Sequence, residues 1–140
     1  MTKRIAYTTE TGGVGVIVPA PDSGLTLAEV AAKDVPQGVE FSIIEASDLP
    51  TDRTFRAAWE KTGTGIVESL DKSKQIAHGR RRAKRAAEMA PHDLEATIPA
   101  KAAAAEAARQ AIRDKHAEIQ IRIYAAVSVA ELRTELAALL

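Results

Sequence analysis

Cysteine is absent from this chain of 140 residues, which excludes a disulfide framework, a thiolate metal site and a cysteine nucleophile. Aromatic residues are also scarce, with one Trp, two Tyr and two Phe. No apolar run approaches the roughly 18 residues that a membrane-spanning helix needs, so we expect no membrane insertion. The first residues lead into a short mixed segment instead of the apolar stretch of a signal peptide, so we expect a protein that is cytoplasmic or that is part of something assembled in a cytoplasm.

The chain also has no net charge, but this value conceals two unlike halves. Residues 1–70 carry 6 Lys and Arg against 10 Asp and Glu, whereas residues 71–140 carry 13 against 9. Of the 28 alanines, 20 lie in the second half. We therefore predict an α+β protein with two domains, a small α/β docking module at 1–70 and a helical arm at 71–140.

Secondary-structure signals in the first half predict a three-stranded sheet with one helix on a face. Residues 3–9 alternate in polarity and residues 14–18 are β-branched, and the glycines between them suit a hairpin turn. Thr26 and Glu29 have the spacing of a capping box, which starts a short helix. Residues 40–45 are typical of a third strand.

The segment at residues 48–59, with the sequence DLPTDRTFRAAW, is the most distinctive part of the chain. Its proline and aspartates suit the start of a helix, on which Phe55 and Trp59 would share one face. Arg53 and Arg56 would flank that face. Two interpretations follow: the aromatic rings fill the space beneath the sheet, or the rings and the arginines bind a partner protein.

The sequence of the second half predicts three helices. A helix is expected over residues 72–89 and ends at Pro91, followed by a linker at 92–99. An Ala-rich helix follows at 100–127, and Ser128 begins a final helix, so that the last two form an αα-hairpin. Because these helices contain few large apolar residues, we expect them to be stabilised by neighbours, including further copies of the chain in a homo-oligomer.

A run of five cations in this half is the strongest electrostatic feature: Arg80, Arg81, Arg82, Lys84 and Arg85. Such a run could follow a phosphate backbone. Successive residues of a helix lie about 100° apart, however, so these side chains surround the helix instead of forming one basic face. The alternative is a solvated stretch or one that pairs with acidic residues.

Local arrangements of catalytic residues are missing. His78, His92 and His116 have none of the spacings of a known zinc site. The glycines at 12–15 lack the lysine and the helix start of a phosphate-binding loop. We therefore expect no enzymatic activity, no catalytic residues, no metal site and no cofactor.

The segment at 48–59 resembles a signature found in small proteins of tailed bacteriophages and prophages, which are typically encoded near the tail-tip and tail-fibre genes. Residues 14–48 and 71–89 are similar to those proteins as well. The resemblance implies a non-enzymatic component of the tail tip or tail fibre, or an attachment factor. Its location would be the virion tail, after assembly in the cytoplasm of the bacterial host, and its partners would be other tail or fibre proteins.

Two alternatives to this function stay open. The protein could be a tail-fibre assembly chaperone that is absent from the virion, or a nucleic-acid-binding accessory protein that uses the basic run at 80–85. Partner contacts are expected from nine residues: Arg53, Phe55, Arg56, Trp59, Arg80, Arg81, Arg82, Lys84 and Arg85.

Overall fold

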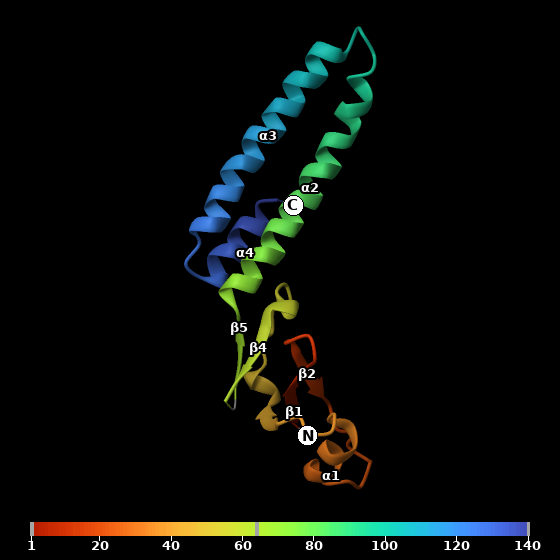
Figure 1. Ribbon diagram of the computed structural model, residues 1–140, viewed down its shortest axis with the longest axis vertical. Helices are drawn as coiled ribbons and strands as arrows, with labels where there is room; N and C mark the ends of the chain where they lie inside the picture. The colour runs from red at the N-terminus through yellow and green to blue at the C-terminus, as the bar shows by residue number, and fades with distance from the viewer. Residues whose placement is uncertain (1, 64, 140) are drawn as a thin grey trace. The chain divides into compact units, whose positions relative to one another are not determined.

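The computed structural model describes residues 2–63 and 65–139 of the chain, which divides into two compact units. The first unit is Met1–Ser69 and the second is Leu70–Leu140. The described residues of the first unit form the strands, one short α-helix and two 3₁₀ turns, and those of the second form α-helices (Figure 1). The predicted α+β class is confirmed.

The first unit is built on a three-stranded antiparallel sheet of order β2-β1-β3. The strands are β1 (Lys3–Thr8), β2 (Val14–Ile17) and β3 (Phe41–Glu45), so the predicted hairpin and third strand are both confirmed. Ile5 pairs with Ile17 on one side and with Ile43 on the other. Alternation along β1 then sends neighbouring side chains to opposite faces of the sheet.

One face of this sheet is covered by α1 (Leu27–Asp34), whose predicted capping box is present. The backbone N–H of Glu29 donates to the Thr26 hydroxyl at 3.2 Å, and the Glu29 carboxylate accepts from the Thr26 N–H at 2.7 Å. Val30 and Ala31 of this helix pack on Ile5. The expected single helix on one face is therefore present.

The opposite face is covered by the segment that follows β3, and here the predicted helix at 51–59 is wrong. The segment forms two 3₁₀ turns, η1 (Ala46–Asp48) and η2 (Arg56–Ala58), and then β4 (Trp59–Thr62), which pairs with β5 (Gly65–Glu68). The Asp52 carboxylate accepts from the Thr54 N–H at 2.7 Å, a local bond that competes with helix formation. Pairing of Trp59 with Glu68 then requires extended backbone.

The second unit consists of α2 (Leu70–Glu95), α3 (Ala102–Ala125) and α4 (Val129–Ala137). The prediction that Pro91 ends the first of these is wrong, because α2 continues for another turn. Proline removes only one backbone hydrogen bond at this point. In this extra turn the Asp93 carboxylate lies 2.9 Å from Nε of Arg109, an ion pair between α2 and α3.

The predicted αα-hairpin between α3 and α4 is confirmed. The Ser128 hydroxyl accepts from the Glu131 N–H at 3.2 Å, as the capping signal requires. The core of this unit includes Ile119 and Ile123 from α3 and Leu132 and Leu136 from α4. None of the helices in the described part of the chain is both long and apolar enough to cross a membrane.

Candidate partner-binding surfaces

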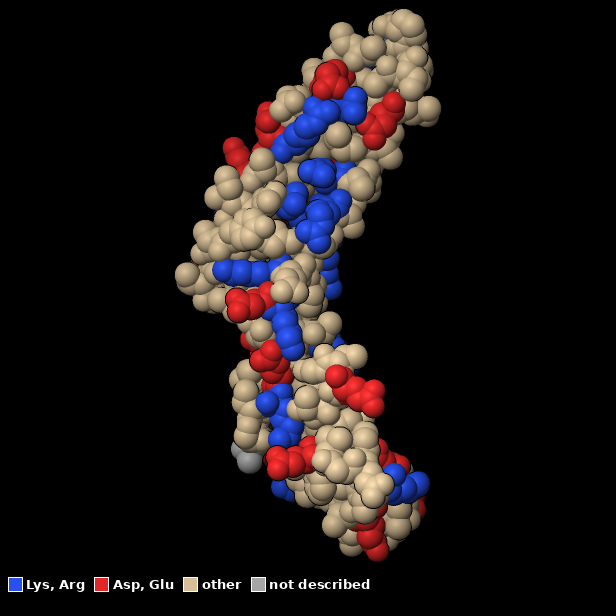
Figure 2. Space-filling view, viewed as in Figure 1, with Lys and Arg blue, Asp and Glu red and all other residues tan. Residues whose placement is uncertain are grey.

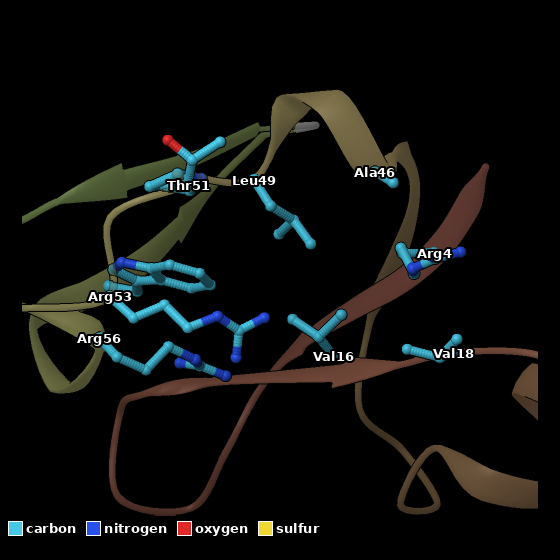
Figure 3. A pocket seen from close by; sticks show the side chains of 10 residues that line it. Arg4, Val16, Val18, Ala46, Leu49, Thr51, Arg53 and Arg56 are labelled. Atoms are coloured by element: carbon cyan, nitrogen blue, oxygen red, sulfur yellow. The ribbon is translucent and has the colours of Figure 1, made fainter.

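A pocket with a volume of about 510 Å³ opens on the sheet face that Trp59 covers (Figure 3). Its floor is formed by the strands β1 and β2, and one wall by the segment after β3. The lining residues are Arg4, Val16, Val18, Ala46, Leu49, Pro50, Thr51, Arg53, Arg56 and Trp59. This size is within the usual range for ligand pockets in proteins.

Arg56 is fixed in this pocket by two contacts. Its Nη2 donates to the backbone carbonyl of Val14 at 2.7 Å, and its guanidinium lies 4.3 Å from the centre of the Trp59 ring. A cation over an aromatic face gains about 0.5–2 kcal/mol. The Arg56 side chain is therefore held in place before any partner arrives.

Arg53 provides a second guanidinium beside the first. Figure 3 shows the two side chains extending in the same direction, toward Val16. Burial, and then the positive charge of Arg53, lower the pKa of Arg56. The two like charges repel each other, and an anion between them would relieve this repulsion.

No carboxylate of the described residues is among those that line the pocket. The carboxylate of Asp48 instead accepts from the backbone N–H of Glu45 at 3.1 Å, and that of Asp52 from Thr54. Arg4, on the other side of the pocket, donates from Nη1 to the carbonyl of Lys3. The side chains that line the pocket therefore include three arginines and no carboxylate.

The nine residues expected to contact a partner are divided between the two units. In the first unit Arg53, Arg56 and Trp59 come together at the pocket. Phe55 is completely buried and does not line it, and Trp59 is only 1% exposed. These two rings therefore have the packing role of the first interpretation, and the arginines supply the accessible surface.

The other five expected residues lie on α2, in the helical unit. Arg80, Arg82 and Arg85 are exposed and Lys84 is half-buried, whereas Arg81 is only 4% exposed. Figure 2 shows lysine and arginine side chains gathered along this unit. Within the described part of the unit, no carboxylate forms an ion pair with Arg82, Lys84 or Arg85.

His78 lies beneath these cations and is buried against α3. Its ring centre is 4.3 Å from that of Tyr124, and Lys74 Nζ donates to the Tyr124 carbonyl at 2.8 Å. Burial, followed by the charges of Arg81, Arg82 and Lys74, lowers the pKa of His78 below its usual value of 6.5. The folded helical unit therefore resists protonation of this ring.

This lowered pKa predicts a loss of stability in mild acid. As the pH falls through 6.5, the unfolded chain binds a proton at His78 before the folded chain does, so unfolding is favoured. We expect His78→Phe to gain stability relative to the wild type between pH 7 and pH 5, measured by urea unfolding followed by circular dichroism. The control Gln75→Ala changes an exposed residue of α2 that does not titrate and should keep the wild-type pH dependence, and an equal effect in both variants would contradict the prediction.

A polar pair that no sequence pattern indicated joins α2 to α3. His116 is fully buried, and its Nε2 lies 2.9 Å from Oε2 of Glu88, which also pairs with Lys115 at 2.8 Å. Desolvation opposes ionisation of Glu88, but hydrogen bonds from Lys115 and His116 outweigh it and lower its pKa. Because 28 residues separate the pair along the chain, helical spacing could not reveal it.

No protein-family model, curated protein or solved structure matches this chain. Within residues 2–63 and 65–139, no three His, Asp or Glu side chains form a group that could hold a metal ion. The residues that the sequence predicts to contact a partner thus meet at two places, the pocket lined by Arg53 and Arg56 and the basic stretch of α2, each within its own unit.

Proposed function

We propose that this protein is a non-enzymatic, tail-associated phage protein that binds another tail or fibre protein through the pocket of its first unit. One observation carries the proposal. The segment at 48–59, on which the resemblance to phage tail proteins rests, provides a wall of the pocket and two of its three arginines. Trp59 of this segment packs on the sheet with Ala6, Val14 and Ile44.

Protein binding suits this pocket because its parts are fixed in advance. Arg56 is anchored by Val14 and Trp59, so little side-chain freedom is lost when a partner binds. Arginine is also common among the residues that dominate binding energies at protein interfaces. The functional residues in this proposal are Arg53 and Arg56.

Three further expectations remain proposals. A fibre chaperone would use the same pocket but would leave before the virion is complete. Nucleic-acid binding would use the exposed cations of α2, although burial of Arg81 removes one of the five from the accessible surface. A homo-oligomer would use the helical unit, where Ile121, Tyr124 and Val127 are exposed.

Site-directed photo-crosslinking in the native host tests the proposed function. A photo-crosslinking residue at position 51, on the pocket wall, is expected to capture a tail or fibre protein. The matched control carries the same residue at position 32, an exposed site of α1, which covers the opposite face of the sheet. The crosslinked proteins are identified by mass spectrometry.

Two results would contradict the proposal. If position 51 captured host proteins alone, the proposed role in the tail would be wrong. If positions 51 and 32 captured the same proteins equally, the pocket would not be the binding site. Mass spectrometry of purified phage particles then distinguishes the remaining possibilities. A virion component is present in the particles, whereas a chaperone is captured in the cell and absent from them.

A further inference from the structure

The pocket lined by Arg53 and Arg56 combines a positively charged surface with an apolar one. The guanidinium groups of Arg53 and Arg56 line one part of it, and the apolar side chains of Val16, Val18 and Leu49 line another. Figure 3 shows Leu49 pointing into the pocket from the wall opposite the strands. Val18 is 63% exposed although its side chain is apolar.

We propose that this pocket binds an acidic peptide segment of the partner protein, with a carboxylate on Arg53 and Arg56 and an adjacent apolar side chain on Val16, Val18 and Leu49. The proposal rests on the proposed function, since it names the chemistry of the partner at the same site. The proposal requires that the peptide's negative charge and its apolar side chain both contribute to binding.

The arginines are arranged for a carboxylate. Planar guanidinium groups bind carboxylates through two parallel hydrogen bonds, which are shorter and stronger than bonds between neutral groups. Arg56 uses Nη2 for the Val14 carbonyl. Arg53 is exposed, and its side chain forms no hydrogen bond or ion pair within the described residues. Both groups therefore keep donors for an incoming anion.

The apolar part of the lining favours a peptide over a nucleic acid. Proteins that hold single strands combine a basic track with exposed aromatic rings on which bases stack. Here the ring beside the arginines, Trp59, is buried beneath Arg56. The apolar lining instead favours a ligand with an apolar group, because covering the valine and leucine side chains removes apolar surface from water and stabilises the complex.

Titration of the full-length protein with synthetic peptides tests this inference. The probe is a capped hexapeptide in which glutamate alternates with leucine. In one control peptide glutamine replaces glutamate, and in the other serine replaces leucine. Binding is followed by NMR shifts of backbone amides and by the emission of Trp59, the only tryptophan.

The glutamate–leucine peptide is expected to bind about tenfold more tightly than either control, with amide shifts around residues 16–18 and 46–56. Arg53→Gln should weaken its binding about tenfold, because one charged bidentate contact is lost. The matched control Lys33→Gln removes one positive charge from an exposed site of α1 and should leave binding unchanged. Unchanged backbone shifts elsewhere in Arg53→Gln show that the unit is folded.

Equal binding of the glutamine peptide, or no effect of Arg53→Gln, would overturn the proposal. It would also be overturned if inorganic phosphate or a single-stranded oligodeoxythymidylate shifted the same amides with equal or higher affinity. The crosslinks at position 51 separate this inference from the proposed function. If the crosslinked segment is acidic but belongs to a protein outside the tail, the inference is supported and the proposed function is not. If the crosslinked protein is a tail protein but the segment has no acidic residues, the proposed function is supported and the inference is not.

Discussion

Trp59→Ala is expected to lower the free energy of unfolding of the first unit by about 3–5 kcal/mol, the usual cost of deleting a buried aromatic ring. Trp59 is 1% exposed and packs against Ala6, Val14 and Ile44, so its removal leaves a cavity beneath the sheet. It also removes the ring on which Arg56 lies. The pocket should therefore lose its shape together with the core.

Hydrogen exchange in increasing urea measures this effect in the full-length protein, with each unit observed through its own amides. The matched control is Phe41→Ala, which removes an aromatic ring that is partly exposed on β3 of the same unit. Protection in β1 and β3 should fall at lower urea in Trp59→Ala than in Phe41→Ala. Equal protection in the two variants would place Trp59 outside the core.

Leu132→Ala is expected to lower the free energy of unfolding of the helical unit by about 2–5 kcal/mol. Leu132 is fully buried on α4, a helix of nine residues that contacts both α2 and α3. So short a helix is not stable by itself, and its burial holds it in place. Loss of this side chain should release α4 before the other two helices.

Urea unfolding followed by circular dichroism measures the loss, since most of the helix lies in this unit. Leu94→Ala is the matched control, because Leu94 is exposed on α2 and its truncation creates no cavity. Emission of Trp59 reports the first unit and should change little in either variant. A midpoint for Leu132→Ala equal to that for Leu94→Ala would mean that α4 adds nothing to stability.

Signals carried by neighbouring residues predicted much of the fold. The capping box of Thr26 and Glu29 and the cap at Ser128 both form as expected, because each depends on residues three apart in sequence. The first hairpin is also a local structure. These signals need no knowledge of the rest of the chain, which is why they succeed.

The prediction failed where distant residues decide the conformation. Phe55 and Trp59 have helical spacing, but the pairing of Trp59 with Glu68 and the burial of both rings overrode that preference. The pocket escaped prediction for the same reason. Arg53 and Arg56 were identified as partner-binding candidates, but nothing in the sequence places Val16 and Val18 opposite them.

The order of the strands in the first unit also sets when its pocket can form. Lys3 at the start of β1 pairs with Glu45 at the end of β3, so the sheet closes only after these distant segments meet. Contacts between residues that are distant in sequence form more slowly than local ones. The pocket takes its floor from β1 and β2 and a wall from the segment after β3, so it is expected to become competent for binding only when β3 has joined the sheet.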